Sequence, residues 1–323
     1  HYGYQVRDLY KGVWILRKEL AKSGKLEDYV KALTYWSGLQ EARMPYEQTR
    51  DGILDAWHTL HNAKVISAML QSDDDKRYAA MMALGKWTSG SLSYTDGTLG
   101  GIKVDGTSFH HGGHYPGYSV GAFGVLGDYC WFTRDTDFAI DEPARRVFKH
   151  TLMTLLDYCN LRDWGVGVCG RHPFNGAIPE KDVEAFARLA LLGDLTGSGQ
   201  SADPELGGAF LLLAGKDKNL QTAMKQAGIR PLTPKEGFRV YNYGGFGIHR
   251  RGDWMITLKG YNSDVWSTEI YAADNRFGRY ISYGSAQIIG AAGAAASGYV
   301  QEGWDWNRSP GVTSIHLPFG KLE

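Results

Sequence analysis

The 323-residue sequence has few cysteines, no excess charge of either sign and no long hydrophobic run. The three cysteines, Cys130, Cys159 and Cys169, show no CxxC spacing and leave one thiol over, which argues against a disulfide scaffold or a zinc ribbon. Lys+Arg 35 balances Asp+Glu 35, so we expect no sequence-independent binding to nucleic acid. No apolar run reaches about 18 residues, so no membrane-spanning helix is expected.

The sequence also lacks an initiating methionine and a signal-peptide pattern. The first residue is His1 instead of methionine, and no signal-peptide pattern follows it. We therefore expect a piece of a longer protein, whose export signal, if it has one, lies upstream. What the sequence has in excess is glycine, 42 residues and about double the usual share, and aromatic residues at 13%. Trp and Tyr with apolar faces and polar tips suit stacking on sugars.

The chain divides into a helical part and a strand-rich part. Apolar spacing predicts helices at 5–22, 26–37, 51–71, 74–88, 118–133, 142–160, 179–193, 206–214 and 218–227. Beyond Pro231 and Pro234, short aromatic or β-branched runs predict strands at 237–249, 253–261, 264–273 and 278–289. Helices followed by strands indicate an α+β multidomain chain, with an all-α domain at 1–234 and the start of an all-β domain at 235–323.

A glycine-rich segment at 89–117 interrupts the helical part. A long loop of this kind inside a helical domain is unusual unless it is functional. It contains His110, His111 and His114, followed by Tyr115 and Tyr118. Three interpretations stay open: a proton-transfer site, a metal site built on the three histidines, or a surface loop rich in turn residues.

Other short motifs are weaker. Residues 117–121 match G-x-S-x-G around Ser119, but no strand precedes them as a nucleophile elbow requires. Residues 165–170 match G-x-G-x-x-G, but they follow a helix, so a dinucleotide site is not expected. Arg171 beside a glycine-rich turn suits a carboxylate or sulfate, although it could equally be structural. Glu269 alternates with apolar residues in a predicted strand, where it would ordinarily face solvent.

Four long blocks together resemble the chondroitin sulfate ABC lyases of polysaccharide lyase family 8. They run in order along the chain: KVDGTSFHHGGHYPGYS, GRHPFN, VWSTEIYAADNRFGRY and QEGWDWNRSPGVTSIHLP. The resemblance implies an incomplete (α/α) toroid followed by the start of an antiparallel β-sandwich domain, with the chain truncated at both ends.

The resemblance also implies roles for individual residues. It places the catalytic functions of the family on His111, Tyr118, Arg171 and Glu269, and a second base for iduronate on His1. The substrate-binding residues that it implies are His110, His172, Asn175, Trp266 and Arg276. It implies no metal ligands among these residues.

The activity implied by the resemblance is cleavage of chondroitin sulfate or dermatan sulfate, with hyaluronan as a further candidate substrate, by β-elimination at the uronic acid, which gives 4,5-unsaturated oligosaccharides. No cofactor is required, although some relatives respond to Ca²⁺ or Mg²⁺. The expected protein is a monomer, secreted or periplasmic in a bacterium, with a glycosaminoglycan as its partner. The alternatives are a glycoside hydrolase on an (α/α) toroid, a serine hydrolase acting through Ser119, and a fragment that binds glycosaminoglycans without cleaving them.

Overall fold

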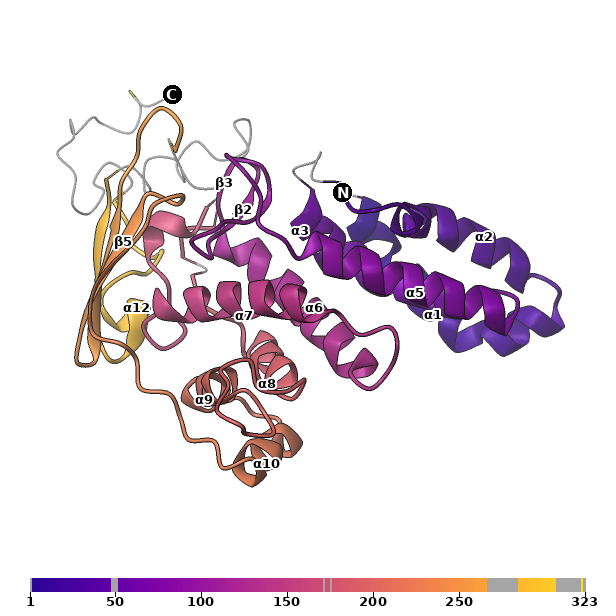
Figure 1. The fold of residues 1–323 in the computed structure, drawn as a ribbon. Helices are drawn as coiled ribbons and strands as arrows, with labels where there is room; N and C mark the ends of the chain where they lie inside the picture. The colour runs from indigo at the N-terminus through magenta and orange to yellow at the C-terminus, as the bar shows by residue number, and fades with distance from the viewer. Residues whose placement is uncertain are drawn as a thin grey trace.

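We describe the protein from a computed structural model, which defines residues 2–47, 52–170, 172–174, 176–265, 284–305 and 321. Figure 1 shows an elongated helical body with an antiparallel sheet standing at one end, remote from α1 and α2. The predicted strand at 264–273 lies almost wholly outside the described residues, as does the beginning of the one at 278–289. None of the described helices is both long and apolar enough to cross a membrane.

The N-terminal helices form a pair with a small core of its own. Helices α1 (Tyr2–Lys22) and α2 (Leu26–Trp36) are joined by a turn in which Gly24 adopts a φ of 71°, a left-handed conformation that favours glycine at the end of a helix. A short 3₁₀ segment, η1 (Leu39–Arg43), follows. Tyr10, Val13 and Leu33 pack with residues of α4 (His61–Met69), which attaches the pair to the rest of the helical body.

The predicted helix at 51–71 is irregular. It consists of α3 (Ile53–Asp55), a π-helical segment η2 (Ala56–Leu60) and α4. Such π segments are rare and occur frequently at functional sites. The next helix, α5 (Asp74–Ser91), begins as predicted because the side chain of Asp73 caps it by accepting from the amide of Lys76.

Helix α6 (Pro116–Thr133), most of which is buried, packs against α8 (Glu184–Ala190), the 3₁₀ segment η4 (Glu180–Asp182) and the π segment η2. The other central elements are α7 (Glu142–Asp157), the 3₁₀ segment η3 (Val166–Val168), α9 (Pro204–Leu212) and α10 (Lys218–Gln226). The predicted helix at 179–193 is thus two short elements, and that at 142–160 ends three residues early. Gly124 and Gly127 let η4 and α8 approach α6 closely, since a Cβ at Gly127 would lie 2.8 Å from the Cα of Ala185.

The glycine-rich segment is a small sheet and not an irregular surface loop. Strands β1 (Gly101–Ile102), β2 (Ser108–His110) and β3 (Gly113–His114) pair antiparallel in the order β1-β2-β3. All seven of their residues are buried. The interpretation as a solvated loop is therefore wrong, because the segment packs between α6 and the larger sheet.

The larger sheet contains β4 (Gly237–Tyr241), β5 (Phe246–Arg251), β6 (Trp254–Lys259) and β7 (Ala286–Ile289), all antiparallel in that order. A short helix, α12 (Gly293–Ala296), follows. The predicted strand at 237–249 is in fact two strands, since a turn at 242–245 reverses the chain. The inner face of the sheet adds Tyr241, Phe246, Ile248, Met255 and Ile289 to the core that the helices share.

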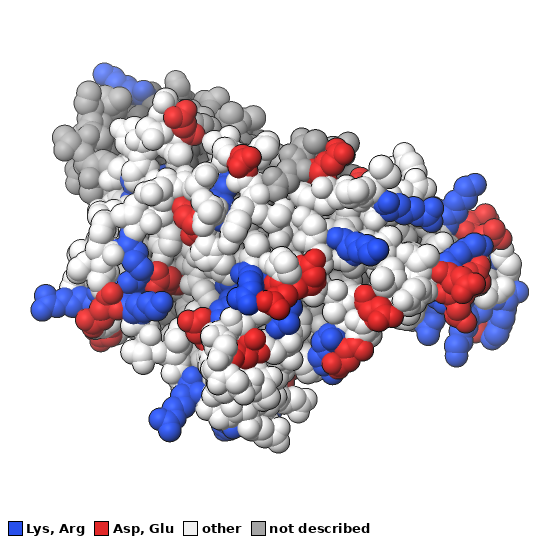
Figure 2. Space-filling model, viewed as in Figure 1, with Lys and Arg blue, Asp and Glu red and all other residues white. Residues whose placement is uncertain are grey.

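A buried arginine joins the sheet to the end of α7. Arg250 of β5 is 3% exposed and donates to Oδ1 of Asn160 at 2.9 Å and to the carbonyl of Cys159 at 2.6 Å. Nδ2 of Asn160 donates in turn to the carbonyl of Ile289 at 3.1 Å. These bonds fix the orientation of the sheet on the helical body. On the face seen in Figure 2, charges of both signs gather at the α1–α2 end.

Candidate active site

The β2–β3 hairpin presents two adjacent histidines at its tip. His110 pairs with Gly113, which leaves His111 and Gly112 as a two-residue turn. Their φ angles are 51° and 76°, as a type I′ turn requires at both central positions. A left-handed conformation is unfavourable for a residue with a Cβ, so His111 is held in a strained position. Strain of this kind is typical of sites where a side chain must point in one direction.

Tyr118 faces this tip from the first turn of α6. Pro116 starts the helix at its first position, where a missing N–H costs nothing, so Tyr118 lies at the positive end of the helix dipole. The ring of Tyr118 stacks on that of His110 with centroids 4.4 Å apart, and the ring of His111 lies edge-on at 6.2 Å. A hydroxyl–hydroxyl hydrogen bond from Ser108 to Ser119 ties β2 to α6 and fixes this arrangement.

The exposure of these side chains differs. His111 and Tyr118 are half-buried and open to a substrate, whereas His110 is only 1% exposed. The structure therefore favours a role for His110 in positioning Tyr118 over the direct substrate contact expected from the sequence.

The π segment and α1 complete the surroundings of Tyr118 with residues that the sequence analysis did not identify. Oδ2 of Asp55 lies 3.7 Å from Nε2 of His110. The ring of His58 lies edge-on to Tyr118 at 6.5 Å, and its Nδ1 is 3.3 Å from the hydroxyl of Tyr4. A glycine is needed opposite this ring, because a Cβ at Gly121 would lie 2.9 Å from Nε2 of His58.

The electrostatic environment keeps His58 neutral. Its pKa is lowered mainly by burial, and further by the positive charges of Lys181 and Arg7. A neutral imidazole can accept a hydrogen bond at one ring nitrogen and donate a hydrogen bond from the other. His58 is thus able to bond to Tyr4 at Nδ1 without bringing a positive charge next to Tyr118.

His114 is turned away from the other two histidines. It is fully buried, its Nδ1 lies 3.0 Å from the carbonyl of Ser108, and its ring packs edge-on against Tyr158 at 5.3 Å. Burial lowers its pKa to about 4, so it is neutral at pH 7. A metal site built on all three histidines is therefore excluded.

One buried and one half-buried polar side chain hold the hairpin segment in place. Nζ of Lys103, a fully buried side chain, donates to the hydroxyl of Thr95 at 2.8 Å and to the carbonyl of Asp96 at 3.2 Å. Oδ2 of Asp105 accepts from the backbone amide of Tyr243 at 3.0 Å, in the turn between β4 and β5. The first set organises the loop before the hairpin, and the second fastens the hairpin to the larger sheet.

The remaining predicted residues are not gathered at this site by the described structure. His172 is exposed, in the turn that follows η3. His1, Arg171, Asn175, Trp266, Glu269 and Arg276 lie outside the described residues. Ser119 is buried and donates to the carbonyl of Tyr115 at 3.0 Å, which leaves it no access to a substrate as a nucleophile.

The described residues contain one cluster able to hold a metal ion. One ligand atom each from Asp55, His110 and His111 lies within 4.8 Å of the others. Two imidazoles and a carboxylate are a ligand set that proteins use for zinc.

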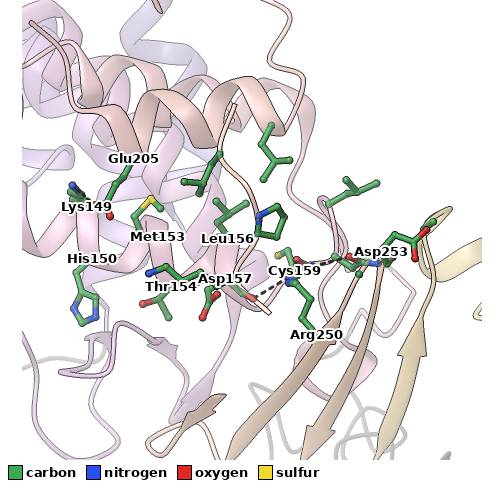
Figure 3. A pocket seen from close by; sticks show the side chains of 18 of the residues that line it. Lys149, His150, Met153, Thr154, Leu156, Asp157, Cys159, Glu205, Arg250 and Asp253 are labelled. Carbon is green, nitrogen blue, oxygen red and sulfur yellow. Dashed lines mark hydrogen bonds and ion pairs between the residues drawn. The ribbon is translucent and has the colours of Figure 1, made fainter. Parts of the chain in front are cut away.

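A separate cavity of about 670 Å³ lies between α7, α9, the chain before β4 and the end of β5 (Figure 3). Two of its cations are engaged with protein groups, and one of them, Lys149, pairs with Asp203 at 2.7 Å and with Glu205 at 2.6 Å. Arg250 serves the sheet anchor described above. The lining also contains His150, whose Nδ1 lies 2.8 Å from the hydroxyl of Tyr94, and Asp157, which pairs with Arg239 at 2.5 Å, so these groups too are engaged within the protein.

Comparison with known proteins places the chain in a family. Residues 1–220 match the family described as "Lyase, catalytic", and the chain therefore belongs to it. The whole chain is 34% identical to a chondroitin sulfate ABC endolyase of Proteus vulgaris over 325 residues, which is 31% of that protein. It is 29% identical to a chondroitin sulfate ABC exolyase of Bacteroides thetaiotaomicron, of which it covers 34%. The resemblance seen in the sequence is thus confirmed, although the chain spans about a third of the length of these relatives.

Solved structures of polysaccharide lyases share the fold. A Paenibacillus xanthan lyase superposes with a TM-score of 0.69 at 16% identity, covering 94% of this chain and 29% of the other. A Streptomyces coelicolor chondroitin AC lyase, solved with chondroitin sulphate, superposes with a TM-score of 0.68 at 14% identity, covering 97% of this chain and 45% of the other. At these identities the likeness concerns the fold.

Proposed function

We propose that the protein is a polysaccharide lyase that cleaves chondroitin sulfate and dermatan sulfate, with hyaluronan as a further candidate substrate, by β-elimination at the uronic acid. The observation that carries the proposal is the half-buried phenol of Tyr118 at a helix start, stacked on His110 and flanked by His111. The family and the ABC lyase relatives support the same chemistry.

The reaction needs a base and a group that neutralises the negative charge of the substrate carboxylate. The C5 proton of a uronic acid is a poor acid while the adjacent carboxylate keeps its charge. In our proposal, His111 and Arg171 donate to that carboxylate and stabilise the enolate-like transition state. The strained backbone of His111 supports this role, since it fixes the imidazole before substrate arrives.

Tyr118 is the proposed base. Its phenolate takes the C5 proton, the C4–O4 bond breaks with its electrons going to O4, and the phenol returns a proton to O4. A double bond forms between C4 and C5, and the proposed reaction uses no cofactor. The phenol lies in the first turn of α6, where the positive end of the helix dipole favours a negative charge.

The other predicted residues have roles that follow from the resemblance. Glu269 would orient Arg171 or a histidine, and His1 would remove the C5 proton of iduronate from the opposite face. Tyr4, three residues after His1, lies against His58 beside Tyr118, which supports a base near the start of α1. His172, Asn175, Trp266 and Arg276 are proposed to bind substrate.

The larger architecture is also a proposal: an (α/α) toroid at 1–234 and the start of a β-sandwich at 235–323. The exposed outer face of the sheet supports it, because Phe238, Val240, Leu258 and Ile288 line that face and are 43% to 59% exposed. An apolar sheet face of this kind is ordinarily covered by a second layer. We further propose a secreted or periplasmic monomer that needs no cofactor and is open to activation by Ca²⁺ or Mg²⁺.

The test is to incubate the full-length protein with chondroitin sulfate, dermatan sulfate and hyaluronan and to follow the ultraviolet absorbance of the unsaturated product. Tyr118→Phe should abolish turnover, while Tyr78→Phe, a change at a surface phenol bonded to Asp137, should leave it intact. New reducing ends without absorbance would instead indicate a hydrolase. Binding without any product would indicate a non-catalytic carbohydrate-binding protein.

A second variant tests the carboxylate role of Arg171. Arg171→Ala should lower kcat more than it raises KM, because a donor that acts on developing charge contributes mainly in the transition state. A raised KM with unchanged kcat would assign Arg171 to docking alone.

A further inference from the structure

We propose that Asp55, His110 and His111 form a site for a divalent transition-metal ion, with Zn²⁺ the best match, and that this ion excludes substrate from the active site. One ligand atom from each of the three residues lies within 4.8 Å of the others. The exclusion of substrate rests on the function proposed above, whereas the binding of the ion does not.

The ligand types decide which ion fits. Ca²⁺ and Mg²⁺ prefer sets made only of oxygen atoms, whereas two imidazoles and one carboxylate suit Zn²⁺ and its neighbours among the transition metals. Three protein ligands also leave a fourth tetrahedral position for water or another group. This site is therefore distinct in chemistry from any Ca²⁺ or Mg²⁺ activation.

The ligands come from elements that are already fixed near one another. His110 and His111 sit on a tight hairpin tied to α6, and Asp55 lies at the end of α3, where the π segment begins. Tetrahedral zinc with bonds of about 2.0–2.1 Å needs ligand atoms about 3.3 Å apart. Oδ2 of Asp55 and Nε2 of His110, at 3.7 Å, are close to that separation already.

An ion can reach the site from one side. His110 is 1% exposed and forms the floor, whereas the Asp55 side chain is 32% exposed and His111 is half-buried. An ion entering past Asp55 would meet all three ligands without unfolding the hairpin. Because His111 would then coordinate the ion, its imidazole could no longer donate to the substrate carboxylate.

The experiment measures ion binding apart from catalysis. Zn²⁺ is titrated into the full-length protein by calorimetry, and Co²⁺ is used as a visible-absorbing substitute that reports four-coordinate geometry. The wild type should bind one ion with intense d–d absorption. Asp55→Asn should weaken binding by about tenfold or more, since the carboxylate ligand is lost. His249→Gln, which alters a histidine beside Trp254 in the large sheet, should match the wild type.

Each outcome decides the proposal. Equal binding in Asp55→Asn and wild type, or a weak six-coordinate Co²⁺ spectrum in both, overturns the site. If the ion binds as expected and the protein yields unsaturated product, Zn²⁺ should raise KM without changing kcat, and a chelator should reverse the effect. A fall in kcat at constant KM would overturn the exclusion of substrate. If the ion binds but no substrate is cleaved, the proposed function fails while the metal site stands.

Discussion

The left-handed backbone of His111 leads to a prediction that separates the proposed catalytic role of its imidazole from the conformational cost of its backbone. His111 has a φ of 51° at the tip of the β2–β3 hairpin. Most residues with a Cβ lose about 1–2 kcal/mol in this conformation, whereas histidine and asparagine are both enriched there and tolerate it better than alanine does. We therefore expect His111→Asn to leave the free energy of unfolding within about 0.5 kcal/mol of wild type, and His111→Ala to lower it by about 1 kcal/mol.

The expected effect on turnover is much larger. Removing one preorganised donor to developing charge typically lowers kcat by about 10²–10³-fold, equivalent to about 3–4 kcal/mol. His111→Asn should lose activity on this scale although it is as stable as the wild type. The two measurements thus assign the imidazole to catalysis and the φ angle to stability.

Ala214 provides a control for the strain argument away from the site. It follows α9 with a φ of 54°, and its amide donates to the carbonyl of Leu211. Glycine avoids the strain of about 1–2 kcal/mol but loses about 0.5–1 kcal/mol more conformational entropy on folding. Ala214→Gly should therefore stabilise the protein by roughly 0.5–1 kcal/mol and leave activity unchanged.

The assay is urea unfolding of each variant, followed by circular dichroism, together with initial rates of unsaturated product on chondroitin sulfate. The reasoning is refuted if His111→Asn retains wild-type kcat, because the imidazole would then not act on the transition state. It is also refuted if Ala214→Gly destabilises the protein, because the left-handed angle would then carry no cost.

Three further predictions concern packing, charge and the contact that anchors the hairpin segment. Gly127→Ala overpacks the contact between α6 and α8 and should lower the free energy of unfolding by about 1–3 kcal/mol. At Gly12 an added Cβ would meet nothing within 4 Å, so Gly12→Ala should raise the free energy of unfolding by about 1 kcal/mol. Urea unfolding measures both values, and equal stabilities of the two variants would contradict the close packing at Gly127. Burial raises the pKa of Asp182 to about 6, so the stability from its protonated form is complete below pH 3.8 and lost as the pH rises through 6. Asp182→Asn should accordingly be about 2 kcal/mol more stable than wild type at pH 8 and equal to it near pH 3.5; a constant difference at both pH values would rule this out. Asp105→Ala removes the carboxylate that accepts from the amide of Tyr243 and should lower the free energy of unfolding by about 1–3 kcal/mol. Turnover should fall as well, and Asp105→Asn should partly restore it. Unchanged stability of Asp105→Ala would show that this hydrogen bond does not hold the hairpin segment in place.

The sequence predicted the regular helices well, because long amphipathic segments and caps are local signals. Asp73 and Asp141 cap α5 and α7, and both helices begin where predicted. The predicted strand at 237–249 was wrong because the turn signal at 242–245, Asn-Tyr-Gly-Gly, lies inside a run of aromatic residues. The three short strands of the hairpin segment have only two or three residues each, too few for any periodicity.

The candidate site was predictable only in part. His111 and Tyr118 came from the resemblance to a family, and the structure brings them together. Asp55 and His58 are three residues apart, so they share one side of a helix, but their sequence gives no indication of which surface they face. That information lies in the contact between Asp55 and His110, which are separated by 55 positions and meet only in the folded chain.

The larger sheet contributes to the position of the β2–β3 hairpin through direct contacts. The turn between β4 and β5 donates to Asp105 through the amide of Tyr243, and a Cβ at Gly244 in the same turn would lie 3.3 Å from the ring of His114. Because Asp105 and His114 bracket His110 and His111 in the hairpin segment, a shift of the sheet would move both imidazoles relative to Tyr118. Tyr118 belongs to α6, which packs within the helical body. The geometry of the site therefore depends on the junction between the two parts of the chain.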